Sequence, residues 1–522
     1  MKRLSKLLEK VDWISCSNDS DPEIVSVVQD SDNVEPGSVF VARSGLISDG
    51  HQYIELALKN GANAIVGELS FEHVRHLFNT KVPYVQVARS SEALAWLAAA
   101  INDFPSEKLV LIGVTGTDGK TTTCNIIYSI LQAAGVSTGL ITTVNAVVGD
   151  DMYDTGFHVT TPDAVALQDL LAQMVSSEIT HCVVEVTSHA LVQDRVASCE
   201  FDMAVLTNVT HEHLDYHGTF LEYMQAKELL INQVDRSTRN KLVILNYDDK
   251  ESYSYFSTRI SSSFIDYSIK KLAVVNAQNI KYGDTNTCFD INIGDDRFEI
   301  VTPLIGDYNI SNCLAAVCVT YNGLSIDTRY IKEGISTIQQ IPGRMEHIRL
   351  GQEFEAVVDF AHTPNSLKNL LLSVRKVTKG RVIVVFGSAG LRDIEKRKMM
   401  GAISTELSDI TIITAEDPRT EPLQDIISEI ALGCEEMGGV EGATYYKIPD
   451  RADAIKYAVN IAENHDIVLA CGKAHEQSMC FGNIEYEWDD RIAMKAAISE
   501  KLGIEAKYPP ELPTSNMDYY DS

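Results

Sequence analysis

The clearest chemical pattern in this chain is a cluster of glycines, threonines and one lysine at positions 115–123. These residues read Thr-Gly-Thr-Asp-Gly-Lys-Thr-Thr-Thr. An apolar run at 109–114 precedes them and a helical pattern at 124–134 follows, the order of a phosphate-binding P-loop. Backbone N–H groups and the helix dipole would then face a nucleotide triphosphate. Lys120 would reach the outer phosphates, and the Thr121 hydroxyl would ligate Mg²⁺.

One departure from the strict P-loop pattern concerns its first glycine. The pattern has glycine at position 114, whereas this chain has Val114, with Gly113 one place earlier. The alternative interpretation is a glycine-rich turn that binds no ligand. The strand before the loop and the helix after it favour the phosphate-binding interpretation.

Acidic and histidine side chains follow two further apolar runs. Glu185 lies in the predicted strand 182–186, where an unpaired charge would be costly, and an ATPase places a metal ligand at such a strand end. His211, His213 and His217 follow the strand 204–208. Their spacing does not match the usual zinc-ligand patterns, so we expect a Mg²⁺ neighbourhood rather than a zinc site.

Three α/β units must position these groups. Residues 1–105 mix strands at 38–42, 62–66 and 82–87 with helices at 55–60 and 91–101. Residues 106–340 contain the P-loop. In residues 341–505, strands at 356–360, 382–386, 410–414 and 467–470 alternate with helices at 365–376, 423–434 and 452–463, which predicts a Rossmann-like, doubly wound parallel sheet.

The loops after the C-terminal strands carry polar residues, at 387–393, 416–419 and 472–476. Loops at the carboxyl ends of parallel strands form the ligand crevice of such sheets. The fold class predicted for the whole chain is therefore α/β with three domains. Residues 506–522 are acidic and contain prolines, and we expect a disordered tail there.

Composition limits the partners and the compartment. The 522 residues include 44 basic and 73 acidic side chains, and the net charge of −29 argues against a nucleic-acid or acidic-membrane partner. None of the ten cysteines forms a C-x-x-C pair, as in a reduced cytosolic protein. No signal-peptide core or membrane-length apolar run is present. We expect a cytoplasmic monomer.

Several motifs occur in a fixed order: residues 115–122, then Glu-Val-Thr-Ser-His at 185–189, His-Leu-Asp-Tyr-His-Gly at 213–218, Gly-Arg-Met-Glu at 343–346 and Asp-Phe-Ala-His-Thr-Pro at 359–364. With these motifs the chain resembles the Mur ligases of peptidoglycan synthesis, to about residue 505. Motifs at 160–162, 191–195, 417–419 and 472–476 are similar to those of the UDP-N-acetylmuramyl-tripeptide synthetases, which add the third residue of the stem peptide.

The resemblance implies a UDP-substrate-binding domain at 1–105, an ATP-binding domain at 106–340 and an amino-acid-binding domain at 341–505. It also implies a reaction. ATP would phosphorylate the carboxylate of UDP-MurNAc-L-Ala-D-Glu, the amine of an amino acid would attack the acyl phosphate, and phosphate would leave. Lys120 and Mg²⁺ would neutralise the charge that builds on the transferred phosphoryl group.

Site residues follow from the same resemblance, by position. The implied catalytic residues are Lys120, Glu185, His213 and Lys227, and the implied metal ligands are Thr121, Glu185, His213 and a carbamylated Lys227. The implied ATP contacts are Gly116, Thr117, Asp118, Gly119, Lys120, Thr121, Thr122, Asn309, Arg344 and Asp359. The implied UDP-substrate contacts are Ser31, Leu46, Ile47, Ser48, Thr160, Thr161, Ser188, Gln193 and Arg195. The implied amino-acid contacts are Arg392, Asp417, Pro418, Arg419, Gly472 and Glu476.

The chain departs from the family pattern at several of its motif positions, without losing a catalytic group. Asp32 stands where Arg is usual, which puts UDP contacts there in doubt. The remaining departures are Asp118 for Asn, Glu212 for Asp, Asn365 for Asp and Ala474 for Gly.

The identity of the added amino acid depends on the loop 416–419. Arg419 can grip a side-chain carboxylate with two parallel hydrogen bonds, which favours meso-diaminopimelate, and Glu476 could pair with its distal ammonium. Asp417 replaces the usual Asn and would disfavour a carboxylate unless Arg419 neutralises it. Lysine and ornithine therefore remain the alternatives.

Two other functions fit parts of the sequence. A folylpolyglutamate-type ligase shares the P-loop and the carbamylated lysine, but the complete N-terminal domain and residues 160–162 argue against it. A P-loop protein without turnover is opposed by the intact Lys120, Glu185, His213 and Lys227. Phosphate release that requires both the UDP-dipeptide and an amino acid would distinguish the three.

Overall fold

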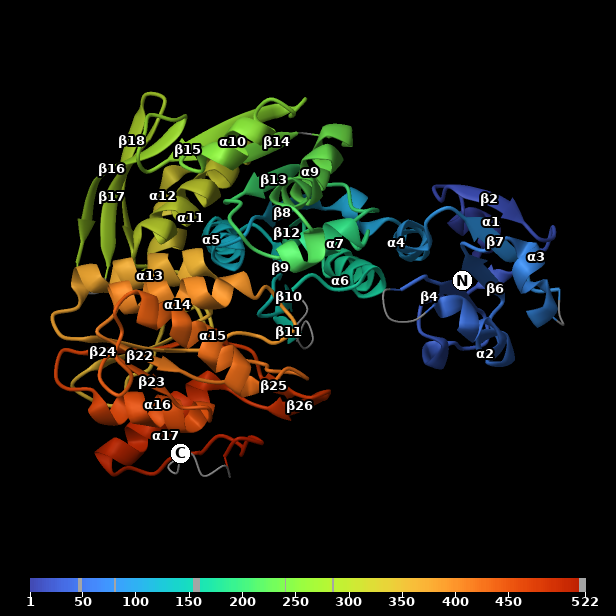
Figure 1. Ribbon diagram of the computed structural model, residues 1–522. Coiled ribbons are helices and arrows are strands. Elements are labelled where there is room, and N and C mark those ends of the chain that lie inside the picture. Colours follow the sequence, from blue (N-terminus) through green and yellow to red (C-terminus); the bar gives the residue numbers. More distant parts are fainter. Residues whose placement is uncertain (46–48, 79–80, 154–159, 240, 284–285, 516–522) are drawn as a thin grey trace.

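Three sheets divide the chain into three α/β domains. The structure is a computed structural model that describes residues 1–45, 49–78, 81–153, 160–239, 241–283 and 286–515 (Figure 1). The N-terminal domain lies to one side, and the central and C-terminal domains lie against each other (Figure 1). The expected fold class is confirmed by this architecture.

The N-terminal domain is built on a five-stranded sheet in the order β2-β7-β6-β5-β4. Its strands are β2 (Trp13–Cys16), β4 (Ser26–Val28), β5 (Ser38–Ala42), β6 (Ala64–Gly67) and β7 (Tyr84–Val87). Every residue of β5 is buried, between a core that includes α4 (Ser90–Ile101) and one that includes α2 (Ile54–Lys59). Helix α4 also packs against α6 (Ala164–Ser176) of the central domain.

The central domain surrounds β8 (Val110–Thr115), the strand that leads into the P-loop. β8 pairs in parallel with β12 (His181–Glu185) on one side and with β13 (Met203–Leu206) on the other. Ile112 and Val114 face a core shared with α5 (Lys120–Ala133) and α11 (Asp307–Val317), whereas Leu111 faces a core shared with α9 (Phe220–Arg236). Burial on both faces explains why β8 is continuously apolar.

The rest of the central sheet extends from these three strands to eleven in total. The other parallel strands are β9 (Thr138–Ile141), β14 (Leu242–Asn246), β15 (Ser263–Ser268) and β16 (Val275–Tyr282). Antiparallel strands close both edges: β10 (Ala146–Val148) and β11 (Asp151–Tyr153), and β17 (Thr287–Ile293) and β18 (Asp296–Thr302). Helices α7 (Ser188–Val192), α8 (Leu214–His217), α10 (Lys250–Phe256) and α12 (Thr328–Ser336) complete the domain.

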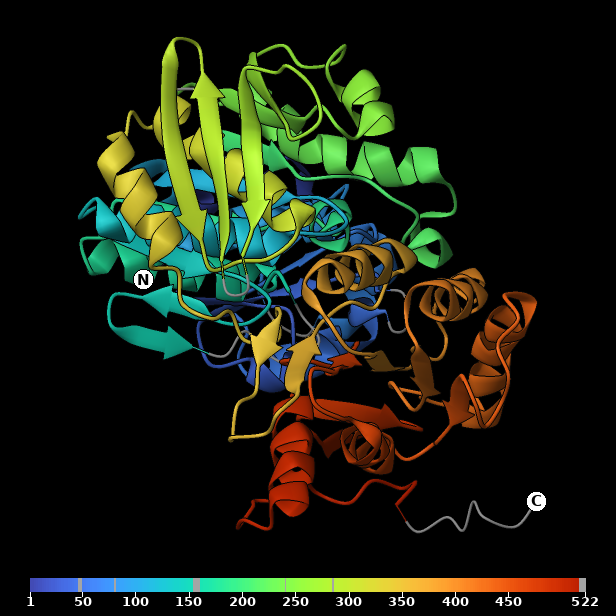
Figure 2. The same ribbon diagram turned by 90° about the vertical axis from the view of Figure 1, so that its left-hand side faces the viewer.

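The C-terminal domain has a six-stranded sheet in the order β19-β20-β24-β21-β22-β23. Its strands are β19 (Glu346–His347), β20 (Glu355–Asp359), β21 (Val382–Phe386), β22 (Ile410–Ile413), β23 (Tyr445–Lys447) and β24 (Ile467–Cys471), all parallel except β19. Helices α13 (Pro364–Val377), α14 (Glu395–Leu407), α15 (Leu423–Glu436), α16 (Arg451–Ile461) and α17 (Asp490–Leu502) cover it. Both views place α13 and α14 between this sheet and the central domain (Figures 1 and 2).

The C-terminal domain also contains elements that the sequence analysis did not predict. These are the strands β19 and β23, the helices α14 and α17, and the hairpin β25 (Ser478–Phe481) and β26 (Ile484–Glu487). Part of the expected disordered tail is packed against this domain. Leu512 is buried, and the hydroxyls of Thr514 and Ser515 donate hydrogen bonds to Asp450 Oδ2 (2.8 and 2.9 Å). Residues 516–522 lie outside the described part of the chain.

Within the residues that the structure describes, no helix is both long enough and apolar enough to cross a bilayer.

Candidate active site between the central and C-terminal domains

The P-loop, residues 115–122, joins β8 to α5. Val114, the departure from the strict pattern, is a fully buried strand residue opposite Glu185 of β12, so the loop itself begins after it. Helix α5 starts at Lys120, four residues before the predicted 124. Lys120, Thr121 and Thr122 therefore lie in the first helical turn, where backbone N–H groups have no partner within the helix and can bind an anion.

Two glycines permit this loop conformation. Gly116 has φ of 149°, and a Cβ atom there would lie 1.9 Å from Thr207 Oγ1. Gly119 has φ of 83°, and its Cβ would lie 2.4 Å from Asn312 Oδ1. Any other residue would collide with the end of β13 or with α11, so both positions require glycine for backbone and steric reasons.

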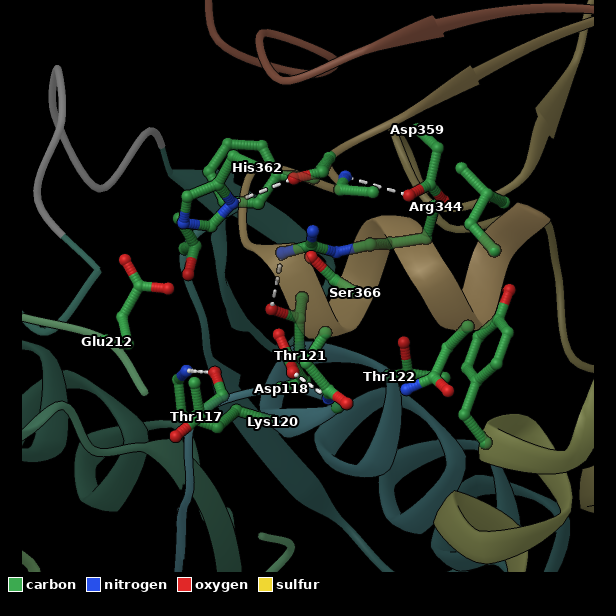
Figure 3. Close-up of a pocket in the computed structure, with 18 of the residues that line it drawn as sticks. Thr117, Asp118, Lys120, Thr121, Thr122, Glu212, Arg344, Asp359, His362 and Ser366 are labelled. Atoms are coloured by element: carbon green, nitrogen blue, oxygen red, sulfur yellow. Dashed lines mark hydrogen bonds between the residues drawn. The ribbon is translucent and has the colours of Figure 1, made fainter. Parts of the chain in front are cut away.

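Around the loop, Thr121 connects the two domains. Its hydroxyl donates a hydrogen bond to Glu185 Oε2 (2.9 Å) and accepts one from Arg344 Nη2 (3.1 Å), which comes from the C-terminal domain (Figure 3). Glu185 is buried and also accepts the Thr143 backbone N–H (3.1 Å). The Lys120 ammonium donates to the Thr117 carbonyl (2.7 Å), and both residues line a cavity between the two domains.

That cavity has a volume of about 720 Å³ and is lined by both domains. Predicted residues on its wall include the P-loop from Thr117 to Thr122 and, elsewhere in the chain, Thr160, Glu185, His213, Asn309, Arg344, Asp359, Arg392, Asp417, Arg419, Gly472 and Glu476. The fold thus places residues that are 250 or more positions apart in the sequence on the wall of one cavity. Gly116, Lys227, Thr161, Ser188, Gln193, Arg195 and Pro418 are not among the residues that form this wall.

Lys227 lies on the buried face of α9, behind the P-loop. Its side chain is 1% exposed, its ammonium donates to the Gly116 carbonyl (2.8 Å), and it lies 4.3 Å from the Tyr223 ring centroid. Burial and the nearby Lys120 charge lower the pKa of Lys227 well below its usual value. The buried stripe at Tyr223, Leu230 and Val234 places position 227 on the same face, so helical periodicity alone could have indicated its burial.

A group of imidazoles lies beside Lys227. His213 is in the left-handed region (φ 54°), and its ring is 4.8 Å from the His189 ring, centroid to centroid. Burial and neighbouring positive charges lower the pKa of His213 well below its usual value, and burial lowers the pKa values of His189 and His217 to about 4. These imidazoles are therefore neutral near pH 7, the form in which a histidine binds a metal.

The donor atoms fit a magnesium ion. The Thr121 hydroxyl, the buried Glu185 carboxylate and neutral His213 all face the cavity. Among the described residues, no group of three His, Cys, Asp or Glu side chains is arranged to hold a metal on its own. A hydroxyl and a carboxylate supply the oxygen ligands that magnesium prefers.

The C-terminal domain contributes two half-buried, opposite charges to the cavity wall, Arg344 and Asp359. Burial lowers the pKa of Arg344 and raises the pKa of Asp359, while each charge opposes that effect on the other. Asp359 accepts the backbone N–H groups of Met345 (2.7 Å) and Ala361 (2.9 Å), and Arg344 stacks 4.5 Å from the Phe360 ring centroid. The Arg344 guanidinium is thereby directed at the P-loop (Figure 3).

At the other end of the cavity, two arginines face the same space. Burial and the positive charge of Arg419 lower the pKa of Arg392, whose guanidinium lies 3.9 Å from Asp215 Oδ2 of the central domain. The backbone of Arg419 exchanges hydrogen bonds with the hairpin of β25 and β26. Its guanidinium has no hydrogen bond or ion pair with any residue that the structure describes, and is available to a ligand.

Asp417 is neutralised by a lysine that the sequence analysis did not single out. Lys473 Nζ lies 2.9 Å from both Asp417 carboxylate oxygens and 2.6 Å from Glu476 Oε2. Lys473 is fully buried, and although burial alone would lower its pKa, the two carboxylates raise it. The structure therefore differs from the expected arrangement, in which Arg419 would have to neutralise Asp417.

Two buried carboxyls in the cavity wall each have one oxygen without a hydrogen-bond partner among the residues that the structure describes. Burial raises the pKa of Glu212 and that of Glu416 to about 7, although the Lys396 ammonium lowers both. Neither residue was predicted as a contact. Both lie next to predicted residues, Glu212 before His213 and Glu416 before Asp417, so their sequence positions were the available signal.

The predicted UDP-substrate residues divide between two domains. Ser31 is buried in the N-terminal domain, and its carbonyl accepts a hydrogen bond from Asn60 (3.1 Å). Leu46, Ile47 and Ser48 lie outside the described residues. In the central domain, Arg195 donates to the Thr161 carbonyl (2.7 Å) and to Gln193 Oε1 (2.6 Å), while Ser188 hydrogen-bonds His217 (2.9 Å).

Arg43, at the end of β5, is a cation that the sequence analysis missed. Its guanidinium donates to Gln29 Oε1 (2.6 Å). Burial lowers the pKa of Arg195, the nearby Asp163 carboxylate opposes that effect, and the positive charge of Arg43 in the N-terminal domain adds to it.

Three family models match successive parts of the chain. The Mur ligase family catalytic domain matches residues 23–102, the Mur ligase middle domain matches residues 114–320, and the Mur ligase glutamate ligase domain matches residues 343–474.

Curated relatives match nearly the whole chain. The UDP-N-acetylmuramoyl-L-alanyl-D-glutamate--2,6-diaminopimelate ligase of Geobacillus thermodenitrificans (strain NG80-2) is 38% identical over 96% of this chain and 100% of its own length. The UDP-N-acetylmuramyl-tripeptide synthetase of Roseiflexus sp. (strain RS-1) is also 38% identical, over 92% of this chain and 95% of its own. A solved structure of a UDP-N-acetylmuramoyl-L-alanyl-D-glutamate--2,6-diaminopimelate ligase is 26% identical, with a TM-score of 0.63 over 92% of this chain and 95% of that one.

Proposed function

The chain belongs to the Mur ligase family, and from this premise we propose that it adds the third amino acid to UDP-N-acetylmuramoyl-L-alanyl-D-glutamate in peptidoglycan synthesis. It is an ATP-dependent ligase that forms an amide bond. The observation that carries the proposal is one cavity whose wall contains the P-loop, Glu185 and His213 at one end and Arg392, Arg419 and Glu476 at the other. Three substrates can meet there.

ATP is held at the P-loop end of the cavity. The free N–H groups of the first turn of α5 bind phosphate oxygens, and the Lys120 ammonium neutralises negative charge on the outer phosphates. Asn309, Arg344 and Asp359 lie on the same side and contact the nucleotide. Mg²⁺, when bound to Thr121, Glu185, His213 and a modified Lys227, would neutralise charge on the transferred phosphoryl group.

Lys227 supports the metal after carbamylation. Its lowered pKa gives the neutral amine, whose nitrogen can add to the carbon of CO₂ and release one proton, leaving an anionic carbamate. This exchange would place a negative group next to the Lys120 charge instead of a second cation, and the carbamate would offer an oxygen ligand to the metal. Burial of a free lysine at this point would otherwise be unfavourable.

The reaction forms two bonds in sequence. An oxygen of the glutamyl carboxylate attacks the γ-phosphorus, the bond to ADP breaks, and an acyl phosphate forms. The neutral amine of the amino acid then attacks the acyl carbon, phosphate leaves with its bonding electrons, and the amine nitrogen loses a proton.

The UDP-substrate is bound by residues of two domains. The muramyl-dipeptide is oriented by Arg195, Gln193, Thr160, Thr161 and Ser188, and the uridine end is bound by Ser31 and the loop 46–48.

We assign meso-diaminopimelate as the added amino acid. Since Lys473 neutralises Asp417, the Arg419 guanidinium remains free to bind the distal carboxylate, with Arg392 as a second cation. Glu476 contacts the distal ammonium, and Gly472 and Pro418 shape the pocket. Five curated relatives are named as diaminopimelate ligases, which supports the assignment. Lysine and ornithine lack the carboxylate.

A screen of amino acids tests the proposal. The protein is incubated with ATP, Mg²⁺, UDP-MurNAc-L-Ala-D-Glu and diaminopimelate, lysine or ornithine, and product is identified by mass. We expect one tripeptide product and phosphate release that needs both the dipeptide and diaminopimelate. Preference for lysine or ornithine would overturn the assignment of the amino acid. Phosphate release without the UDP-substrate would overturn the ligase step.

We further propose the domain roles and the physical state of the protein. Residues 1–105 bind the uridine end, residues 106–340 bind ATP, and residues 341–505 bind the amino acid. The protein acts as a cytoplasmic monomer on soluble substrates, without a nucleic-acid or membrane partner. A single monomeric mass in solution, measured by light scattering with and without substrates, would agree with this.

A further inference from the structure

Two departures from the family pattern, Asp118 and Asn365, contact each other in the structure. Asn365 Nδ2 donates a hydrogen bond to Asp118 Oδ2 over 2.7 Å. Thr363 Oγ1 lies 3.4 Å from the other carboxylate oxygen and donates to it. Asp118 belongs to the P-loop, whereas Thr363 and Asn365 lie at the start of α13 in the C-terminal domain, so the contact crosses the boundary between the two domains.

The backbone of Asp118 is fixed by the central domain. Its N–H donates to Asn208 Oδ1 (2.9 Å), and its carbonyl accepts from Asn208 Nδ2 (3.1 Å) and Thr207 Oγ1 (2.6 Å). These bonds leave only the side chain to extend from the loop. It extends toward α13, so Asp118 contacts both the central and the C-terminal domain.

The start of α13 is equally well defined. Thr363 is the N-cap, Pro364 is the first helical residue, and Thr363 and Ser366 form a capping box. Asn365 therefore lies in the first turn. A carboxylate at this end of a helix is stabilised by the helix dipole, which favours Asp118 in its observed place.

A second contact between the domains joins Arg344 of the C-terminal domain to Thr121, three residues after Asp118. The Arg344 guanidinium donates to Thr121 Oγ1 (3.1 Å). We propose that Asp118 and Asn365 are positioning residues: their hydrogen bond holds the C-terminal domain on the P-loop, and the nucleotide site is complete only when this contact is made. This inference rests on the proposed function for the identity of the nucleotide, and extends it to how two domains build one site.

The chemistry of the pair allows a charge exchange as a test. Asp118→Asn leaves two amides, which can still form a hydrogen bond. Asn365→Asp sets two carboxylates against each other, although a carboxylate in the first turn would by itself favour α13. The double variant Asp118→Asn, Asn365→Asp restores one amide and one carboxylate with the direction of the bond reversed.

Binding of a non-hydrolysable ATP analogue to the full-length protein with Mg²⁺, measured by calorimetry, gives the readout. We expect Asn365→Asp to weaken binding about tenfold and the double variant to recover to within about threefold of the wild type, a coupling of ordinary size for groups in contact. Asn460→Asp, an exposed position on α16, is the matched control for the added charge and should bind like the wild type.

Two results would overturn the proposal: Asn365→Asp binding the analogue as tightly as the Asn460→Asp control, or the double variant binding no better than Asn365→Asp alone. If Asn365→Asp does not fold, the variants Asp118→Ala, Asn365→Ala and their combination provide a second cycle, and additive effects there would equally reject the contact. The binding experiment contains neither the UDP-substrate nor an amino acid. A wild type that binds the analogue here but forms no tripeptide in the amino-acid screen would therefore reject the proposed function and leave this inference standing.

Discussion

The two ends of the cavity are built in different ways. At the P-loop end, consecutive residues from Thr117 to Thr122 contribute to the wall, and the start of α5 presents backbone N–H groups that can bind an anion. At the amino-acid end, Arg392, Arg419 and Lys473 come from three loops that follow β21, β22 and β24. There, Lys473 pairs with Asp417, 56 residues away, and with the nearby Glu476, whereas the Arg419 guanidinium has no ion pair with any described residue.

This difference determines what a substitution does. A backbone site tolerates changes around it but depends fully on the one ammonium that supplies charge. A site of balanced side chains distributes its charge over several pairs, so one change shifts the choice of ligand more than it removes binding. The following predictions test this contrast, from the largest effect to the smallest.

Replacing Lys120 should have the largest effect. Lys120→Ala removes the only P-loop ammonium next to the phosphates while leaving the loop backbone in place, so kcat should fall by about 10³-fold or more. Steady-state phosphate release measures the loss, and circular dichroism should show an unchanged fold. The exposed Lys59→Ala is the control. Near-normal turnover in Lys120→Ala would remove the phosphate role from this residue.

Replacing Lys227 should have the second-largest effect on activity. Losing the carbamate removes one oxygen ligand for the metal, and kcat should fall by about 10²-fold or more. Formate or acetate should restore part of the activity, because a small carboxylate can enter the space that the side chain vacates. With ¹³CO₂, the wild type should give a carbamate carbon signal in NMR spectra that the variant lacks. Full activity without any added carboxylate would exclude the carbamate.

Arg419→Asn should change the choice of amino acid. The variant leaves the distal carboxylate of diaminopimelate without its main partner, so kcat/KM for diaminopimelate should fall by about 10- to 100-fold. The value for lysine, which has no such carboxylate, should change little and serves as the internal control. Equal losses for both amino acids would show that Arg419 supports the loop rather than selecting the ligand.

Asp417→Asn should have the smallest effect. The amide oxygen can still accept the Cys480 N–H (2.8 Å) and the Lys473 ammonium, which keeps its pair with Glu476. We expect kcat/KM to change by less than about fivefold, and equally for diaminopimelate and lysine. A selective gain for diaminopimelate would mean that Asp417 is not neutralised by Lys473 and repels the substrate carboxylate.

The sequence predicted the P-loop end well because its information is local. A strand, two glycines, Lys120 and a helix follow one another within 25 residues, and each has a recognisable pattern. The burial of Lys227 could also be read from the spacing of apolar residues on α9. The spacing does not indicate carbamylation, which stays a prediction that rests on the family resemblance alone.

The amino-acid end was harder to predict because its charges are paired over long separations. Lys473 and Asp417 are 56 residues apart, and nothing near either position indicates the other. The sequence analysis placed Asp417 in the pocket but named Arg419, rather than Lys473, as the cation that would have to neutralise it. The same holds for Asp118 and Asn365, two separate departures from the family pattern whose contact spans 247 residues.

The convergence of α5 and α13 on one cavity has a consequence for how fast nucleotides arrive. The whole molecule has a net charge of −29 and repels polyanions such as ATP at long range, whereas the helix starts attract them only at contact. Raising ionic strength from about 0.01 to 0.15 M shortens the screening length from about 30 to 8 Å, which removes the repulsion before it weakens the contacts. The association rate constant of the nucleotide should therefore increase with salt over this range, opposite to the behaviour of a protein that steers anions with its overall charge.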